Sequence, residues 1–263
     1  MKKKLLLIWV LIFYSFAFNA KAEIEHCFIV KGKDGFIIKD GKDCNTRYSP
    51  ASTFKIVLAL IGYEAGILKD ENYPIWKPSE PITFLENYWS GEKTPSNWMR
   101  FSVVWYSKIL TTKLGMDKFK MFIEKLNYGN KDLSGNFGKN DGLTQAWLGS
   151  SLLISPLEQI DLIEKLAKND LPLSIETQIK AKNLIRLFEE SMLTNGWTIY
   201  GKTGFCFNDK TRKKEGYFVG FAEKDNEIIS FVMHLNGDKD SKVSGILAKK
   251  MTLDRLDKEC LLK

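Results

Sequence analysis

A serine and a lysine three residues apart, Ser52 and Lys55, open the otherwise apolar segment ASTFKIVLALIG at residues 51–62. Lysine is almost never fully buried without a partner, so its place in this segment needs a reason. Residues three apart on a helix share a face, so the two side chains can meet. Burial favours the neutral amine, which can take the proton of a neighbouring hydroxyl. The pair therefore predicts a serine nucleophile that is activated by a buried lysine.

The same spacing recurs at Ser90 and Lys93, in a polar stretch beside glycine and proline. Because S-x-x-K is a weak pattern by itself and this copy lacks an apolar helix, we interpret it as chance. A Ser-His-Asp triad is not favoured, since the only two histidines, His26 and His234, neighbour no good nucleophile. The lysine-based route is the better supported one.

A second motif, Lys202-Thr203-Gly204, lies in the strand-like segment YGKTGF. Glycine in a strand permits the close approach of another backbone. A strand that carries lysine and threonine can hold an anionic substrate, and its edge can pair with an extended amide. S-x-x-K early in the chain and K-T-G late are together typical of penicillin-recognising acyl transferases.

The periodicity of the chain predicts the elements that must hold these motifs. Residues 27–48 are typical of two strands around Lys33-Asp34-Gly35, and residues 196–237 are typical of further strands. The middle of the chain is mostly helical, as in TTKLGMDKFKMFIEKLN and SPLEQIDLIEKLAKND, and an amphipathic helix ends the chain. We therefore expect an α+β fold, with an antiparallel sheet from the N- and C-terminal segments, flanking helices and a helical lobe.

We expect one catalytic unit over residues 23–263. Its sheet-containing lobe would comprise residues 23–58 and 178–263, and its helical lobe residues 59–177. Before it, residues 1–22 have the basic start, the short apolar run and the Ala20-Lys21-Ala22 site of a secretory signal peptide. Cleavage before Glu23 would give a periplasmic protein without stable membrane insertion; the alternative is an uncleaved anchor.

The charge of the chain does not indicate a nucleic-acid partner. The formal net charge is +7, and removal of the four lysines of the signal peptide leaves +3. The one dense basic cluster, KTRKKEG at residues 210–216, is interpreted as a solvated hairpin loop. Four cysteines follow no zinc-binding pattern, and no metal site is expected. Cys27 and Cys44 bracket the first hairpin and can form a disulfide after export, whereas Cys206 and Cys260 are interpreted as free buried thiols.

Further short motifs complete an ordered set. STFK at 52–55 is followed by SVV at 102–104, YGN at 128–130, WL at 147–148 and KTG at 202–204. In this order and spacing, the set resembles a class D β-lactamase, an oxacillinase, over essentially the whole mature chain. The resemblance implies the fold of serine β-lactamases and penicillin-binding transpeptidases, and hydrolysis of β-lactams as small-molecule substrates.

The resemblance also implies a role for each motif. Ser52 would be acylated, and Lys55 would carry a carbamate, N6-carboxylysine, formed from carbon dioxide and acting as general base; no other cofactor is implied. The indole N–H of Trp147 would stabilise that carbamate, and Ser102 with Lys202 would serve the leaving nitrogen. The backbone N–H groups of Ser52 and Phe205 would form the oxyanion hole. The remaining positions expected to contact substrate or to wall the carbamate are Val104, Leu148, Thr203, Gly204 and Ser244.

Two positions are interpreted as structural. Tyr128-Gly129-Asn130 is expected to support the fold, and Trp89 to pack at the rim of the cleft. One departure concerns the substrate carboxylate, which many family members bind with an arginine after the last strand. No arginine lies between Gly237 and Lys250, and Arg255 is too far along the helix. Thr203 with Ser244, or a nearby lysine, is the expected substitute.

Two other functions stay open on the sequence alone. One is a β-lactam-sensing domain that is acylated and does not turn over. The other is a peptidoglycan transpeptidase or carboxypeptidase that uses the same motifs. Steady-state turnover of a penicillin separates all three.

Overall fold

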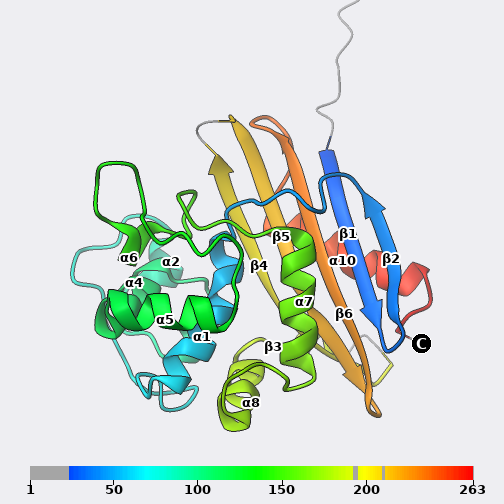
Figure 1. The fold of residues 1–263 in the computed structure, drawn as a ribbon, viewed down its shortest axis with the longest axis horizontal. Coiled ribbons are helices and arrows are strands. Elements are labelled where there is room, and N and C mark those ends of the chain that lie inside the picture. Colours follow the sequence, from blue (N-terminus) through cyan, green and yellow to red (C-terminus); the bar gives the residue numbers. More distant parts are fainter. Residues whose placement is uncertain (1–23, 192–194, 209–210, 263) are drawn as a thin grey trace, which may run out of the picture.

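The structure is a computed structural model that describes residues 24–191, 195–208 and 211–262 (Figure 1). The predicted signal peptide lies outside the described residues. Among those that are described, no helix has the length and apolar character needed to cross a bilayer.

A six-stranded antiparallel sheet forms the centre of the fold, in the order β2-β1-β6-β5-β4-β3. Strand β1 from the start of the chain pairs with β6 from its end. The expected sheet of N- and C-terminal segments is therefore confirmed. The strands are β1 (Ile24–Gly32), β2 (Gly35–Gly41), β3 (Arg186–Leu187), β4 (Thr198–Asn208), β5 (Lys213–Lys224) and β6 (Glu227–Asp238).

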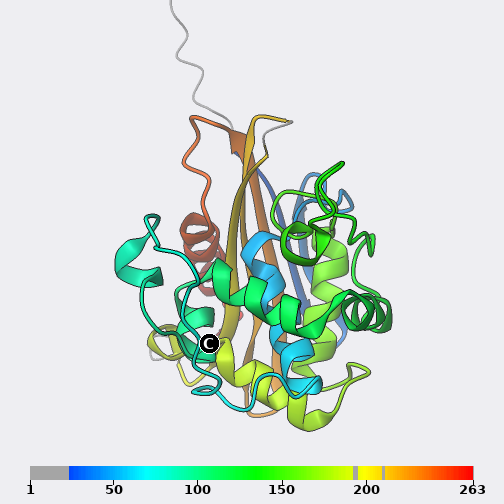
Figure 2. The same ribbon diagram turned by 90° about the vertical axis from the view of Figure 1, so that its left-hand side faces the viewer.

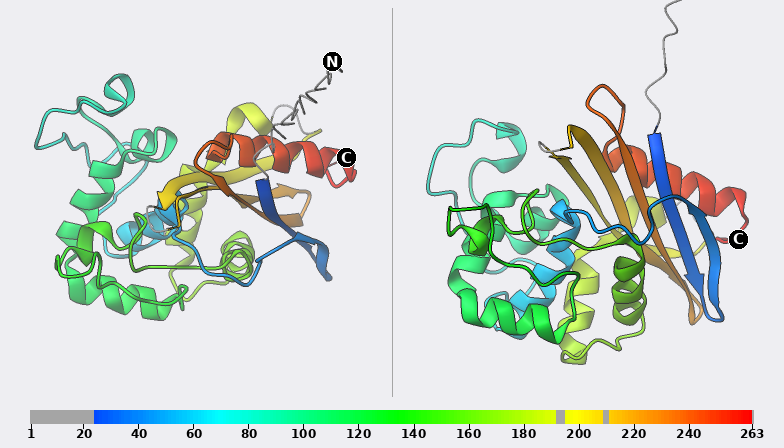
Figure 3. Two further views of the ribbon diagram at one scale, coloured as in Figure 1. Left: turned by 90° about the horizontal axis from the view of Figure 1, so that it is seen from above. Right: turned by 45° about the horizontal axis from the view of Figure 1, so that its top comes forward.

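Helices cover both faces of the sheet, and a separate group lies beside it (Figures 1 and 2). They are η1 (Ala51–Phe54), α1 (Lys55–Glu64), α2 (Glu86–Trp89), α3 (Pro95–Arg100), α4 (Val104–Leu114), α5 (Met116–Lys125), α6 (Gly142–Gln145), α7 (Pro156–Ala167), α8 (Ile175–Leu184), α9 (Phe188–Ser191) and α10 (Gly245–Lys258). Figure 3, seen from above, places α10 on one side of the sheet and the helical lobe on the other.

Each face of the sheet carries its own apolar core. Successive strand residues point to opposite faces. Cys27 and Ile29 of β1 accordingly join the core shared with the helical lobe, whereas Phe28 and Val30 join the core under α10. Helix α7 packs on the face of the sheet that is turned toward the helical lobe (Figure 1). The sequence prediction placed this segment in the helical lobe, over residues 59–177.

The helical pattern predicted within residues 111–127 is confirmed, and it belongs to two helices, because Gly115 with φ 80° ends α4 before α5 begins. Two other expectations need correction. The basic cluster at 210–216 is not simply a solvated loop, since β5 begins at Lys213 and Glu215 is 2% exposed. Cys260 is a free thiol but an exposed one.

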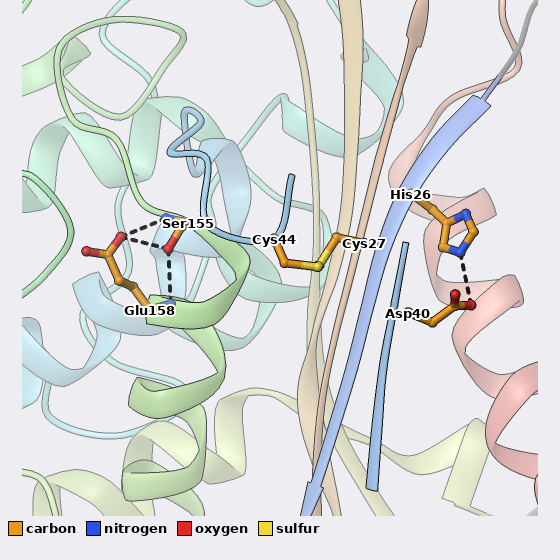
Figure 4. Close-up of a disulfide and its surroundings, with 6 residues drawn as sticks. All are labelled: His26, Cys27, Asp40, Cys44, Ser155 and Glu158. Atoms are coloured by element: carbon orange, nitrogen blue, oxygen red, sulfur yellow. Dashed lines mark hydrogen bonds and ion pairs between the residues drawn. A yellow bond between two sulfur atoms is a disulfide. The ribbon is translucent and has the colours of Figure 1, made fainter. Parts of the chain in front are cut away.

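A disulfide joins Cys27 of β1 to Cys44, in the segment that leads to η1 (Figure 4). The Cys44 carbonyl also accepts a hydrogen bond from the Leu157 N–H, in the first turn of α7. That helix starts with the capping box of Ser155 and Glu158. The chain entering η1 is thus fixed to both the sheet and α7.

Candidate active site

Ser52 and Lys55 meet where η1 passes into α1. Lys55 is fully buried, and its Nζ lies 3.1 Å from Ser52 Oγ, which is itself partly exposed. Ser52 lies on a 3-10 turn, whereas Lys55 is the first residue of the α-helix, so the two do not share one regular helix. Burial, with a smaller contribution from the charge of Lys202, holds the pKa of Lys55 well below its usual value. Burial therefore favours the uncharged amine, which lies beside a reachable hydroxyl.

The turn that carries Ser52 is held from outside. Ala51 has φ 48°, a left-handed conformation that costs free energy for a residue with a side chain. Its N–H donates to the Trp147 carbonyl at 3.1 Å, and the Ser49 hydroxyl donates to the same oxygen at 2.9 Å. The Trp147 loop thus fixes the backbone just before the nucleophile.

Strand β4 brings the K-T-G motif to this turn. A Cβ on Gly204 would lie 2.9 Å from Thr53 Cγ2 and 3.2 Å from the Pro50 carbonyl oxygen, so glycine permits the contact. Lys202 is 5% exposed, and its Nζ donates to the Thr203 carbonyl at 3.1 Å. Burial, aided by the charge of Lys249, lowers the pKa of Lys202 to about 7. The two predicted motifs therefore lie together.

The edge of β4 next to the turn is available to a ligand. Strand β3 pairs with Ile199 and Tyr200 only, and the Gly201 N–H bonds to the Ile185 carbonyl. Beyond them, the described residues provide no backbone partner on this edge for positions 202–206, while Phe205 is 48% exposed. An extended amide can pair there.

Ser102 lies in the turn between α3 and α4, in a left-handed conformation with φ 57°. The indole N–H of Trp89 donates to the Phe101 carbonyl at 2.9 Å, and the Trp105 indole donates to the Trp89 carbonyl at 2.9 Å. Trp89 therefore holds the backbone before Ser102. Among the described residues, the Ser102 hydroxyl makes no hydrogen bond to Ser52, Lys55 or Lys202.

Trp147 is fully buried against Phe54 and Phe119, with ring centroids 5.6 and 6.3 Å away. Its Nε1 is buried and has no hydrogen-bond partner among the described residues. Because a buried indole N–H normally finds an acceptor, this donor marks a place where an acceptor belongs. Leu148 packs half-buried on the same core, and Val104 begins α4.

The YGN motif has the structural role expected for it. Asn130 Nδ2 donates to the Ser151 carbonyl at 2.8 Å, and Asn130 Oδ1 accepts from the Leu153 N–H at 2.9 Å. The Tyr128 ring packs on Phe54 with centroids 5.1 Å apart. The motif therefore fixes the loop that follows Trp147.

This chain is similar to known proteins over most of its length. The family described as penicillin binding protein transpeptidase domain matches residues 26–253. β-Lactamase OXA-9 of Klebsiella pneumoniae is 36% identical over 92% of this chain and 93% of its own, and OXA-1 of Escherichia coli is 37% identical over 81% and 76%. The crystal structure of the class D β-lactamase OXA-427 superposes with a TM-score of 0.81, at 38% identity, over 89% of this chain and 98% of that one. The chain belongs to the class D β-lactamases.

In this class D β-lactamase, Ser244 serves first as a helix cap. Its Oγ accepts from the Leu247 N–H at 3.1 Å at the start of α10. The next residue, Gly245, lies against β4, where an added Cβ would be 2.7 Å from the Gly204 carbonyl oxygen. Ser244 is thus placed near the K-T-G strand.

A cavity of about 370 Å³ opens beside Lys202 and Thr203. Lys249 of α10 lines it and forms an ion pair with Glu190 of α9. The sequence alone did not predict Lys249 as a site residue. Its position four residues after Gly245, on the same face of a helix, is the signal that could have placed it near β4. Lys249 is therefore a candidate for the positive charge that would replace the carboxylate-binding arginine of many family members.

Proposed function

We propose that this chain hydrolyses β-lactam antibiotics, penicillins and oxacillin-type compounds among them, through an acyl-enzyme on Ser52. The observation that carries the proposal is the contact of 3.1 Å between Lys55 Nζ and Ser52 Oγ. It is supported by Trp147, whose ring packs on Phe54, the residue before Lys55, and whose buried indole N–H lacks an acceptor among the described residues. A neutral amine next to a hydroxyl is the arrangement that activates a serine in the absence of histidine. Resistance to β-lactams is the expected consequence for the cell.

The surroundings of Lys55 fit a carbamate. Only an uncharged amine reacts with carbon dioxide, and burial keeps the Lys55 pKa low. The product is a buried anion, which needs donors, and Trp147 Nε1 is a donor without a partner among the described residues. When it is present, the carbamate supplies the general base for both half-reactions. Val104 and Leu148 would shield it from bulk water.

The residues of the chain then have separate tasks. Ser52 Oγ forms the new bond to the β-lactam carbonyl carbon, and the carbon–nitrogen bond of the ring breaks. Ser102 and Lys202 deliver a proton to the leaving nitrogen; with a pKa of about 7, Lys202 can exchange protons near neutrality. The backbone N–H groups of Ser52 and Phe205 stabilise the oxyanion. Water attacks the ester in the second half-reaction and regenerates Ser52.

The substrate carboxylate would be held at the β4 side of the cleft. Thr203 offers a hydroxyl, Ser244 lies at the adjoining start of α10, and Lys249 supplies a positive charge. The Glu190 partner neutralises part of that charge and orients the amine. This arrangement would replace the arginine that many family members use.

The compartment is proposed to be the periplasm. A signal peptide over residues 1–22 and the Cys27–Cys44 disulfide support export to an oxidising environment. N-terminal sequencing of the secreted protein should begin at or near Glu23. Recovery of the form that starts at Met1 from the membrane fraction would support an anchored protein instead.

Steady-state turnover of a penicillin tests the central proposal. Repeated turnover, with an adduct on Ser52 detected by mass spectrometry during the reaction, is expected. A single burst that leaves a stable acyl-enzyme would contradict hydrolysis and favour a sensor or a transpeptidase. An adduct on any other residue would contradict the assignment of the nucleophile.

A further inference from the structure

One wall of the cavity beside Lys202 carries two acids, Glu189 and Glu190, that have no part in bond making or breaking. This wall is formed by the segment from the end of α8 through β3 to α9, together with α10. The Gly201 N–H donates to the Ile185 carbonyl at 2.8 Å and holds the start of that segment against β4, and both α9 and α10 pack on the same strand. At about 370 Å³, the cavity is in the size range of ligand pockets.

Two ion pairs lie on this wall, and one of them is sheltered from water. Lys249 of α10 is paired with Glu190, and the two side chains are 29% and 17% exposed. Arg100 Nη2 lies 3.7 Å from Glu189 Oε1, and those side chains are 71% and 85% exposed. Arg186, which also lines the cavity, is exposed. Because water screens exposed charges strongly, the sheltered pair dominates the electrostatics of the cavity.

A bound substrate would change the charge balance of the sheltered pair. In the proposed function the β-lactam carboxylate lies against Lys249, so this one ammonium group would then face two carboxylates. Lys202 offsets the difference only in part, because burial lowers its pKa to about 7 and its Nζ already donates to the Thr203 carbonyl. A largely buried carboxylate that shares its cation with a second anion costs free energy. The complex therefore lacks one positive charge beside Glu190.

We propose that Glu190 makes the enzyme prefer β-lactams that carry a positive charge next to their carboxylate. In a cephalosporin, the C3 substituent is attached to the ring carbon beside the one that bears the carboxylate. With that carboxylate at Lys249, the substituent reaches the cavity that Glu190 lines, and a pyridinium group there supplies the missing charge. Glu190 is thus a specificity-determining residue. The inference rests on the proposed function, because it concerns the choice among substrates of the same site.

The test uses two cephalosporins with the same acyl side chain, one with a pyridinium group on the C3 methylene and one with a neutral acetoxy group there. Steady-state kcat/KM is measured for both in the full mature enzyme. The ratio of the two values is then compared between variants, so that the different intrinsic reactivities of the compounds cancel.

Glu190→Gln keeps the shape of the side chain and removes its charge. We expect the ratio of kcat/KM, pyridinium over acetoxy compound, to fall about tenfold, because the attraction between Glu190 and the substrate cation is lost. Glu190→Asp keeps the charge and should retain a ratio close to that of the wild type. Should Glu190→Gln fail to fold, Glu190→Ala makes the same test.

Glu189→Gln is the matched control, since it removes the same charge from the adjacent residue of the same wall, where the side chain is 85% exposed. It should leave the ratio unchanged. A ratio that does not fall in Glu190→Gln, or that falls equally in Glu189→Gln, would overturn the inference and leave the proposed function intact. The same holds for a wild-type enzyme that turns over a penicillin and neither cephalosporin. A wild-type enzyme that turns over no penicillin would instead overturn the proposed function.

Discussion

Two segments of this chain carry the same S-x-x-K spacing in opposite environments. At Ser52 and Lys55 the lysine is fully buried and its Nζ contacts the serine hydroxyl at 3.1 Å. At Ser90 and Lys93 the serine is exposed at the end of α2, and the lysine Nζ donates to the Ser90 carbonyl. The difference teaches that the spacing has no chemistry of its own. It becomes reactive only where burial keeps the amine neutral and the hydroxyl stays reachable.

The two serines give the largest expected difference in activity. Ser52→Ala should lower kcat for a penicillin at least about 10³-fold, because no covalent intermediate can form. Ser90→Ala should leave kcat unchanged, since Ser90 is exposed at the end of α2 and its S-x-x-K partner Lys93 bonds to its backbone carbonyl. The measurement is steady-state hydrolysis, with circular dichroism to show that both variants fold. Comparable losses in the two variants would contradict the contrast.

Replacement of the two lysines of the S-x-x-K segments should affect activity and stability in different ways. Lys55→Met removes the base and should inactivate the enzyme. It should also raise the melting temperature in degassed buffer, because a buried amine with no opposite charge beside it among the described residues is replaced by an apolar side chain of similar length. Each ~1 kcal/mol gained corresponds to about 2–4 °C at this chain length.

Lys93→Met is the matched variant and should change neither quantity appreciably. A Lys55→Met protein that melts lower than wild type would show that the amine is well paired in the folded state. That result would sink the interpretation of Lys55 as a strained, functional residue.

A substitution of Trp147 tests whether its indole N–H stabilises the proposed carbamate on Lys55. Trp147→Phe keeps the aromatic contact with Phe54 and removes the N–H donor. Loss of a donor to a buried anion costs ~1–3 kcal/mol, which is about a tenfold to hundredfold change in carbamate occupancy. The variant should therefore depend more on added bicarbonate than the wild type does, and deacylation should slow more than acylation. If neither protein responds to bicarbonate after degassing, Lys55 acts as a free amine.

Lys249 differs from both of these lysines, because it is half-buried and paired with an acid. Lys249 forms an ion pair with Glu190 and lines the cavity beside Lys202 and Thr203. Lys249→Met should raise KM for a penicillin by about tenfold with little change in kcat, because a charged hydrogen bond to the substrate is lost. A penicillin methyl ester, which lacks the carboxylate, is the control substrate and should be insensitive to the change. Equal effects on acid and ester would remove Lys249 from carboxylate recognition.

The sequence predicted those parts of the fold and site that local pattern controls. The strand runs, the capping box at Ser155 and the ordered motifs needed only neighbouring residues to be seen. Glu215 was interpreted as solvated because basic residues precede it, and its burial depends on the β4–β5 register that places Cys206 opposite. The unpartnered indole of Trp147 and the ion pair of Lys249 likewise depend on tertiary contacts within the described part of the chain. Such environments come from segments that are distant in sequence, so periodicity cannot reveal them.

The last comparison, with no expected effect on activity, concerns a second buried basic side chain, His234. His234 of β6 is 2% exposed and stacks between Tyr48 and Tyr217, with ring centroids 4.2 and 4.7 Å away. Its Nε2 has no hydrogen-bond partner among the described residues, and burial lowers its pKa from 6.5 to about 3. The unfolded chain therefore binds a proton between these values while the folded chain does not. Stability from this group is present above pH 6.5 and is lost as the pH falls toward about 3.

His234→Phe keeps the stacking and removes the titration. Between pH 7 and pH 4.5 it should reduce the loss of unfolding free energy by on the order of 2–3 kcal/mol, measured by urea denaturation at each pH. His26→Gln is the comparison variant, because it removes a partly exposed histidine instead of a buried one. Parallel stability curves for wild type and His234→Phe would mean that the buried imidazole finds a proton acceptor in the folded state. Penicillin turnover at neutral pH should be unchanged, because burial of a basic group creates a catalyst only where a nucleophile lies beside it, as Ser52 lies beside Lys55.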